Sequence, residues 1–342
     1  MLKKIKSIFL KKNSKSAIEF YLIDAFEIYH FLPLYLYLKD KKINVNFVAE
    51  PCFSNTSKKW FDYKNALRIL KELKLHFYTK CNENAKIAFT TQRVELLDKY
   101  KNIKARLSYG IGLNNSNFSI DKNSFEGFNL IFIHGQYQKD KLKKDNAYII
   151  GYPKYDYFKD LPFKDLTSIY NIHTKKPILL YLPTYDEDSS IQKFAPFIKS
   201  LQEDFFIVSK PHHCTARLKD KKTDFLLLKE LSNVLLSPNE TLFDCVRLAD
   251  FVLVDAKSGA SSEIVYIDKN IKFILLSPRK YCLEQYFNQD ILECSKIVNN
   301  PKNLKEAILQ ASYPYKKPIN YFYKDKSYLN LDLIFKELSR YL

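Results

Sequence analysis

An alternation of short apolar runs with longer amphipathic stretches constrains the fold most strongly. Runs of β-branched and aromatic residues predict strands, and apolar residues three or four positions apart predict helices. This alternation is typical of βαβ units around a parallel sheet. In the first half we expect strands at 18–23, 43–49, 86–90, 104–108, 130–134 and 147–151, and helices near 32–40, 60–74, 92–101 and 136–144.

The alternation restarts after the aromatic- and proline-rich stretch "GYPKYDYFKDLPFKDL". A chain of 342 residues also suits two domains of average size. We therefore predict an α/β protein with two facing, doubly wound domains, at residues 17–160 and 161–342, and a cleft between them. Expected strands of the second half lie at 177–183, 205–209, 225–228, 251–254 and 272–276.

One helix start in the second half has a clear signature. Ser237, Pro238 and Glu240 match the N-cap, the first-turn proline and the third helical residue of a capping box. Leu242 and Val246 follow at helical spacing. We expect a helix that begins at Ser237.

Net charge favours an anionic partner. The 55 Lys and Arg residues exceed the 38 Asp and Glu residues and give a formal charge of +17, which suits a nucleotide, a phosphorylated polymer or an anionic membrane face. A general bias in composition is the alternative, because lysines occur throughout the chain. The six cysteines show no CxxC pairing, so we expect reduced, mostly buried thiols and a cytoplasmic location.

Residues 1–16 form a basic leader, "MLKKIKSIFLKKNSKS". On a helix, its apolar residues would lie on one face edged by lysines, a pattern suited to the surface of an anionic leaflet. An ordinary solvated leader is the alternative. No apolar run approaches the roughly 20 residues needed to cross a bilayer.

The turn after the strand at 205–209 carries the first candidate site. It reads "SKPHH" and places Lys210, His212 and His213 at a strand end, where open α/β folds bind their ligands. The ammonium of Lys210 and the imidazole of His212 could neutralise charge in phosphoryl transfer. A polar turn that only caps the strand is the alternative.

Two glycine loops also follow predicted strands. Gly110 and Gly112 lie in "SYGIGLNNS", and Gly259 lies in "VDAKSGASSE". Because the chain has only six glycines, we expect each where backbone geometry requires one. A helix beginning near Ser261 and Ser262 would offer amides and hydroxyls to phosphate oxygens, or the serines would simply cap a turn.

Further candidates come from other strand ends. Thr184 and Tyr185 in "YLPTYDEDSS" could meet an acceptor or a phosphate, or could only form a turn. His30, near the start of the first helix, would point toward the cleft or be a half-buried structural residue. We expect the remaining histidines away from these turns to be structural: His76, His134 and His173.

Missing motifs exclude several classes. The chain lacks GxxxxGK[ST], GxGxxG, HExxH, GxSxG and zinc-spaced Cys/His sets, which argues against P-loop enzymes, dehydrogenases, zincins and serine esterases. It also lacks an RNP pattern, so nucleic-acid binding rests on charge alone and is not expected. No residue is assigned as a metal ligand, and a need for a divalent metal stays open.

A series of segments in order resembles the CDP-glycerol glycerophosphotransferase family, from about residue 105 to 276. The segments are "SYGIGLNN", "FNLIFIHGQYQKDKL", "YIIGYPKYDYF", "ILLYLPTYDEDSS", "IVSKPHH", "TLFDCVRLADFVLVDAKSGASSE" and "IKFILL", and "YHFLPLYLYL" shows a weaker likeness. The resemblance implies a GT-B architecture with an acceptor-side N-terminal domain and a donor-binding C-terminal domain. It implies transfer of a polyol phosphate from a CDP-linked donor to a hydroxyl of a membrane-linked glycan, at the inner face of the cytoplasmic membrane, with release of CMP.

The resemblance also assigns residues. His212 matches the histidine of the family's Lys-Pro-His motif. The donor loop of the family, Asp-x-Ser-Ser, has one extra residue here and matches a set of phosphate-binding candidates: Asp255, Ser258, Gly259, Ser261, Ser262 and Glu263. Asp186 stands where family members commonly carry a basic residue.

Tyr109 and Gly110 stand where the family has His-Gly, its site of acceptor activation. Tyrosine is a poor base at neutral pH because its ordinary pKa is near 10. Either His30 takes this role, or Tyr109 only orients the acceptor, or the chemistry has changed. Two further functions therefore stay open: a GT-B glycosyltransferase that uses a nucleotide sugar, and a non-catalytic protein that binds a nucleotide or a glycan.

Overall fold

The computed structural model describes residues 17–50, 63–110, 125–159, 164–268, 270–279, 296–311 and 327–342. The predicted leader and Gly112 lie outside these residues. The chain forms two compact units. Unit 1 comprises Met1–Tyr109, Phe118–Tyr157 and Asn320–Leu342, and unit 2 comprises Gly110–Asn117 and Phe158–Ile319.

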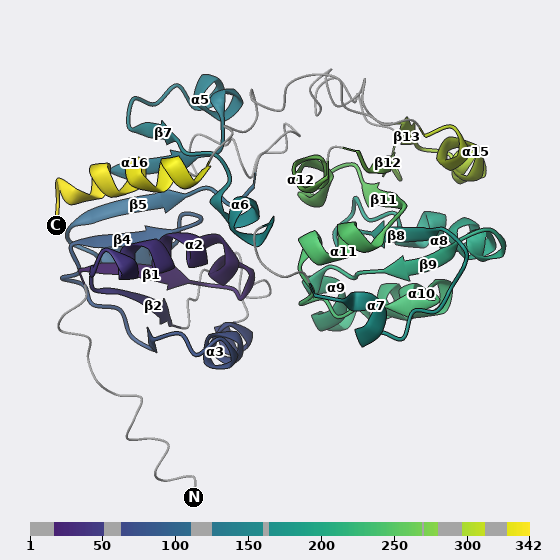
Figure 1. Cartoon of the computed structure of the whole chain (residues 1–342), viewed down its shortest axis with the longest axis horizontal. Coiled ribbons are helices and arrows are strands. Elements are labelled where there is room, and N and C mark those ends of the chain that lie inside the picture. Colours follow the sequence, from purple (N-terminus) through teal and green to yellow (C-terminus); the bar gives the residue numbers. More distant parts are fainter. Residues whose placement is uncertain are drawn as a thin grey trace, which may run out of the picture. The chain divides into compact units, whose positions relative to one another are not determined.

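Unit 1 is built on a parallel sheet with helices on its faces (Figure 1). Its strand order is β3-β2-β1-β4-β5-β6-β7. The strands are β1 (Ile18–Leu22), β2 (Val45–Ala49), β3 (Phe77–Tyr78), β4 (Ile87–Thr90), β5 (Ile103–Leu107), β6 (Leu130–Ile133) and β7 (Ala147–Ile149). The helices are α2 (Phe26–Asp40), α3 (Tyr63–Glu72), α5 (Gln136–Leu142), α6 (Pro153–Lys159) and α16 (Ser327–Ser339), with a 3-10 turn at Glu95–Lys99.

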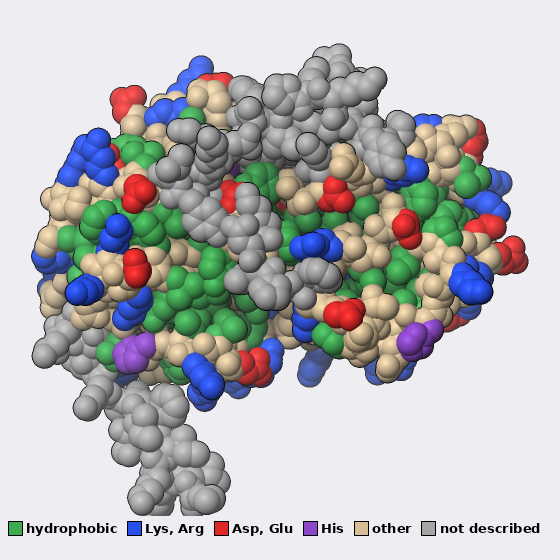
Figure 2. All heavy atoms as spheres, in the orientation of Figure 1, with side chains coloured by type: hydrophobic (Ala, Val, Ile, Leu, Met, Phe, Trp, Pro, Cys, Tyr) green, Lys and Arg blue, Asp and Glu red, His purple; other side chains and the backbone are tan. Residues whose placement is uncertain are grey.

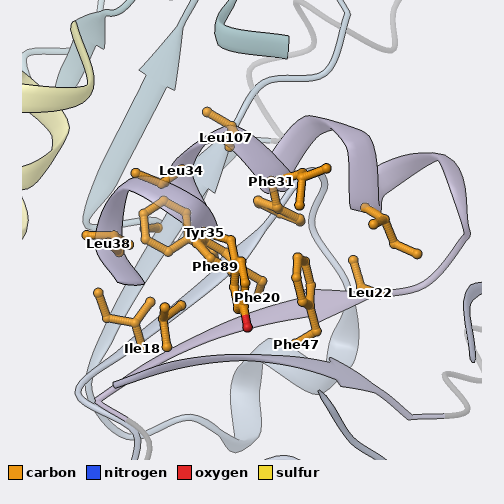
Figure 3. Close-up of a cluster of buried hydrophobic side chains, with 14 of the residues drawn as sticks. Ile18, Phe20, Leu22, Phe31, Leu34, Tyr35, Leu38, Phe47, Phe89 and Leu107 are labelled. Carbon is orange, nitrogen blue, oxygen red and sulfur yellow. The ribbon is translucent and has the colours of Figure 1, made fainter. Parts of the chain in front are cut away.

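Strands β1, β2, β4 and β6 are buried along their whole length, as expected where both faces of a sheet are covered. Phe20 in β1 packs among Phe31, Phe47 and Phe89 on the face covered by α2 (Figure 3). Tyr21, the next residue, belongs to the core on the opposite face. This alternation with a period of two fixes which side chains reach the strand ends.

Unit 2 repeats the architecture with the strand order β10-β9-β8-β11-β12-β13, again all parallel. Its strands are β8 (Ile178–Leu182), β9 (Phe206–Ser209), β10 (Val234–Leu235), β11 (Phe251–Asp255), β12 (Lys272–Leu276) and β13 (Lys296–Val298). Its helices are α7 (Leu166–Ile169), α8 (Ile191–Ser200), α9 (His213–Arg217), α10 (Lys222–Leu231), α11 (Leu242–Leu248), α12 (Ala260–Ile267) and α15 (Leu304–Leu309). Short 3-10 turns lie at Leu201–Glu203, Lys219–Lys221 and Pro301–Asn303. The prediction of two doubly wound α/β domains is confirmed.

Two predictions of local structure are wrong. The apolar run at 225–228 belongs to helix α10, which buries Asp224, Leu228 and Leu231 at helical spacing; four apolar residues in a row do not distinguish a strand from a helix. Helix α11 begins at Leu242, not at Ser237. Its N-cap is Thr241, whose side chain accepts a hydrogen bond from the amide of Asp244 over 3.1 Å.

The C-terminal segment requires a correction to the predicted domain division. Residues 320–342 belong to unit 1, not to the second domain. Helix α16 buries Leu331, Ile334 and Leu338 in the core that also contains α2. The physical reason is that one face of the unit 1 sheet has apolar surface that α16 covers.

Each sheet has a switch point, where the strand order reverses and ligands of open α/β folds bind. In unit 1 it lies between β1 and β4, and in unit 2 between β8 and β11. The loops after these strands therefore become the places to look for function. Among the described residues, no helix is long and apolar enough to cross a membrane.

Charged side chains are interspersed on the face of the molecule shown in Figure 2. Lys and Arg alternate with Asp and Glu among the residues coloured there. On this face the basic side chains are thus not gathered into one block.

Candidate functional site

In unit 2, His212 and Tyr185 meet at the carboxyl edge of the sheet. Tyr185 follows β8 and His212 follows the neighbouring strand β9. Their ring centres lie 4.4 Å apart at an interplanar angle of 31°, and the His213 ring lies 4.1 Å from that of His212. Both Tyr185 and His212 are half-buried. The structure therefore brings together two residues that were predicted separately.

His212 also caps helix α9. Its Nδ1 accepts a hydrogen bond from the backbone amide of Cys214 over 3.2 Å. Because Nδ1 acts as an acceptor, the neutral ring carries its proton on Nε2. The capping role and the functional role are compatible, since they use different nitrogens.

The surroundings of His212 favour the neutral ring. Its pKa is held well below its ordinary value, first by burial and then by the charges of His213, Lys210 and Arg217. An uncharged imidazole N–H with cationic side chains around it is suited to bind an oxyanion. Lys210 contributes to this group of charges. Arg217 also contributes, and the sequence did not indicate it because it lies inside α9 and not at a strand end.

Asp255 has a different role from the predicted donor contact. It is fully buried, and its Oδ2 accepts hydrogen bonds from the amides of Thr184 (2.7 Å) and Ser190 (3.1 Å). Burial raises the pKa of its carboxyl group to about 7. Asp255 therefore holds the loop between β8 and α8, and through it the ring of Tyr185. Thr184 is itself buried and enters this arrangement through its backbone.

The serine loop after β11 is closed by internal hydrogen bonds. The hydroxyl of Ser261 is buried and donates to the carbonyl of Ser258 over 2.7 Å, so the structure turns it away from the predicted phosphate contact. Ser258 is half-buried and accepts from the amide of Ala260 over 3.3 Å. Glu263 is half-buried, and the side chain of Ser262 lies outside the described residues.

Gly259 is not required by backbone geometry. It adopts φ −56° and ψ −30°, which any residue can adopt, and a Cβ at Gly259 or Gly110 would have no atom within 4 Å. The expectation that each glycine answers a geometric need is wrong at these two positions. It holds at Gly127 and Gly151, where φ is +76° and +77°. Open space above an exposed Gly259 is suited to close approach of a ligand.

Acidic side chains flank the same edge. Lys257 pairs with Asp188 over 3.2 Å and Arg279 pairs with Glu187 over 3.1 Å. Burial and neighbouring carboxylates raise the pKa of Asp186. Because Lys257 and Arg279 are paired with carboxylates, Lys210, His212 and Arg217 are the better candidates at this edge for binding an anion.

In unit 1, the side chains of His30 and Tyr109 lie close together. Their ring centres are 6.0 Å apart, and the His30 ring also stacks on Tyr152 at 5.8 Å. The hydroxyl of Tyr152 donates to the carbonyl of Tyr109 over 2.8 Å. Residues from the ends of β5 and β7 thus converge on helix α2.

Two basic neighbours of His30 were missed. Lys154 Nζ lies 3.5 Å from His30 Nε2, and the ring of His134 lies 4.2 Å from that of Tyr152. The pKa of His30 is lowered well below its ordinary value by burial, and further by Lys154 and His134. The strand-end rule could have identified Lys154, because it follows β7, but the stretch that contains it reads as a domain boundary.

One group in the described part of the chain has the composition of a metal site. Ligand atoms of His212, His213 and Cys214 all lie within 4.8 Å of one another. Cys214 is fully buried and the Nδ1 of His212 already accepts the Cys214 amide. Because Nδ1 is engaged in the helix cap, His212 would offer Nε2 to a metal ion.

Comparison with known proteins supports the fold and the family resemblance. A family model described as CDP-Glycerol:Poly(glycerophosphate) glycerophosphotransferase matches residues 115–255. No curated protein matches the sequence.

Several solved structures share the fold. UDP-GlcNAc 2-epimerase from Neisseria meningitidis, bound to UDP-GlcNAc, has a TM-score of 0.60 at 14% identity. The alignment covers 94% of this chain and 99% of the epimerase chain. UDP-N-acetylglucosamine 2-epimerase from Rickettsia bellii has a TM-score of 0.60 at 12% identity and covers 95% and 96%. UGT89C1 from Arabidopsis thaliana, complexed with UDP-L-rhamnose, has a TM-score of 0.54 at 12% identity and covers 95% and 100%.

These likenesses confirm the GT-B-like class, and the family match supports a transferase. The resemblance to the CDP-glycerol glycerophosphotransferase family, predicted from the sequence, is confirmed by the match over residues 115–255.

Proposed function

We propose that this protein transfers a polyol phosphate, such as glycerol phosphate, from a CDP-linked donor to a hydroxyl of a cell-surface glycan. The observation that carries the proposal is His212, a neutral ring with its proton on Nε2, beside the cationic side chains of Lys210 and Arg217. Such a group is suited to the pyrophosphate of a nucleotide-activated donor. The family match over residues 115–255, which includes His212, supports the same chemistry.

The reaction requires positioning and charge neutralisation more than covalent chemistry by the protein. The acceptor oxygen attacks the β-phosphorus of the donor and forms the new phosphodiester bond. The bond between this phosphorus and the bridging oxygen breaks, CMP leaves with that electron pair, and the hydroxyl proton passes to a base or to water. His212 Nε2–H and Lys210 stabilise the charge that develops on the departing CMP.

A direct test follows the nucleotide product. Purified protein is incubated with a panel of CDP-alcohols and with UDP- and GDP-sugars, together with glycan acceptors, and release of CMP, UDP and GDP is measured. CMP release from a CDP-alcohol supports the proposal. Turnover of nucleotide sugars alone would contradict it.

A sugar transferase is the second candidate function. Structures with this fold have been solved with UDP-GlcNAc and with UDP-L-rhamnose bound. Asp186 also replaces the basic residue common in the glycerophosphotransferase family. The same panel decides between these candidates, and nucleotide binding with no turnover of any donor would indicate a non-catalytic binding protein.

We also propose that the protein works at the inner surface of the cytoplasmic membrane. The proposal rests on the lysines and apolar residues of positions 1–16. Flotation with vesicles that contain anionic lipid tests it. We expect the full chain to float with these vesicles and not with neutral ones, and deletion of residues 2–16 to abolish flotation.

A further inference from the structure

Lys154 and His30 form a pair at the carboxyl edge of the unit 1 sheet. Lys154 belongs to the first turn of α6, immediately after β7, and its Nζ lies 3.5 Å from the Nε2 of His30. The ammonium also lies 4.8 Å from the centre of the Tyr155 ring. Because an ammonium group only donates hydrogen bonds, its approach makes Nε2 the acceptor and leaves the ring proton of His30 on Nδ1.

The two side chains differ in how far solvent reaches them. His30 is 4% exposed, whereas Lys154 is half-buried. An imidazole that is covered, and whose basic nitrogen faces a cation, is poorly placed to take a proton from a substrate. It is well placed to orient the ammonium, because the rings of Tyr109 and Tyr152 restrict its own orientation.

Two aromatic rings complete the surroundings of this pair. Phe26 and Tyr109 are half-buried, their ring centres lie 5.4 Å apart, and each ring centre lies 6.0 Å from that of His30. Flat apolar rings offer contact area to the C–H face of a sugar at a small cost in side-chain entropy. An ammonium beside them forms charge-assisted hydrogen bonds with a carboxylate or a phosphate.

We propose that Lys154 binds an oxyanion, a carboxylate or a phosphate, carried by the sugar acceptor, which packs on Phe26 and Tyr109. His30 is a positioning residue that holds the ammonium. This inference rests on the proposed function and names the class of its acceptor as an acidic glycan. It assigns His30 a role other than that of the acceptor base.

Binding of simple sugars to the full chain tests the proposal. The probes are methyl β-D-glucuronide, glucose 6-phosphate and the neutral methyl β-D-glucoside, compared by saturation-transfer NMR titration at equal ionic strength. We expect both anionic sugars to bind at least tenfold more tightly than the neutral one. The glucuronide and the phosphate distinguish the two sources of the oxyanion, and preference for either one supports the proposal.

Three variants make the test specific. Lys154→Met should abolish the preference for anionic sugars, Lys154→Arg should retain much of it, and Lys101→Met, at an exposed lysine of the same unit, should leave it unchanged. Equal binding of neutral and anionic sugars by the natural protein would overturn the proposal. So would an unchanged preference in Lys154→Met, or no binding of either anionic sugar.

The role of His30 has its own readout. Nitrogen-15 NMR of the imidazole should show His30 protonated on Nδ1 in the natural protein, with its pKa raised in Lys154→Met because a neighbouring cation is removed. A His30 resonance that does not respond to Lys154→Met would contradict the pairing. Lys154→Met should leave the affinity for CDP unchanged, because the residues proposed to bind CDP lie in unit 2. Loss of the sugar preference can therefore be distinguished from failure of the donor site.

Discussion

At the scale of residues, buried Asp255 determines how the loop between β8 and α8 is held. Its Oδ2 accepts hydrogen bonds from the amides of Thr184 and Ser190. Its other oxygen, Oδ1, has no hydrogen-bond partner among the described residues. An asparagine could retain both amide bonds through its carbonyl and would place a neutral amide group at the second position. An alanine would leave both amides unsatisfied.

We predict opposite effects for these two substitutions. In the native protein the pKa of Asp255 is about 7, above its ordinary value of 3.8, so folding stability contributed by the protonated form is lost as pH rises from about 4 to 7. Asp255→Asn has no titrating group at this position and should not show this loss. The stability of Asp255→Asn relative to the natural protein should therefore increase as pH rises from about 4 to 7. Asp255→Ala should lower the free energy of unfolding by about 1–3 kcal/mol.

Denaturant unfolding at several pH values measures both effects. A constant difference in stability between Asp255→Asn and the natural protein from pH 4 to 7 would contradict the assigned titration. The measurement does not depend on knowing the substrate.

Gly259 gives a second prediction at this scale. Because its φ is ordinary and a Cβ would meet open space, Gly259→Ala should fold with an unchanged melting temperature. If the donor approaches the backbone there, the KM for a CDP-alcohol should rise about fivefold or more. An unchanged KM would show that the donor does not approach this glycine.

Gly127 provides the matched control. It has φ +76°, and a Cβ there would collide with the guanidinium of Arg93. Gly127→Ala should therefore lower stability by about 1–2 kcal/mol and leave the KM unchanged. The two alanine variants thus separate a binding effect from a folding effect.

At the scale of elements, α16 is part of unit 1 although it is the last helix of the chain. Leu338 is fully buried in the core that contains α2 and β1. Leu338→Ala should lower the free energy of unfolding of unit 1 by about 2–5 kcal/mol. Leu309→Ala, in α15 of unit 2, should change stability by less than about 0.5 kcal/mol, because Leu309 is 67% exposed.

Hydrogen exchange resolves the two units separately. We expect Leu338→Ala to accelerate exchange in the strands of unit 1 and to leave β8 to β12 protected. Equal acceleration in both units would contradict the assignment of α16 to unit 1.

The sequence was sufficient to predict elements with long, strongly apolar patterns. Strands such as β1, β8 and β11 are buried on both faces, so their apolar runs mark them plainly. The prediction of a strand at 225–228 was wrong because the helical spacing becomes visible only with Asp224 and Leu231, the other buried residues of α10, which lie outside that run. The two-residue strands β3 and β10 carry too short a pattern to be recognised.

The sequence predicted which side chains follow the strands but not how those side chains are oriented. The strand-end rule located His212 and Tyr185, which the structure places in contact. It could not show that Asp255 and Ser261 turn inward, because that depends on which loop amides and carbonyls need partners. Lys154 was missed because the stretch after β7 that contains it reads as a domain boundary, and its approach to His30 depends on the tertiary structure.

At the scale of the whole molecule, we propose that unit 2 binds a cytidine nucleotide through His212. Thermal protection by nucleotides tests the choice of base. We expect CDP to raise the melting temperature of unit 2 more than UDP or GDP at equal concentration, because a ligand that binds only the folded state stabilises it by mass action. Greater protection by UDP would favour the sugar transferase instead.

The role of His212 is decided by the dissociation constant of CDP, measured by calorimetry in the natural protein and in His212→Asn. Asparagine can still cap α9 by accepting the Cys214 amide, but it removes the Nε2–H donor. We predict that CDP binding weakens about tenfold or more, as loss of a hydrogen bond to a charged group implies, with an unchanged melting temperature. His213→Asn is the control, with a smaller effect. Equal affinity of the natural protein and His212→Asn for CDP would contradict the role of His212.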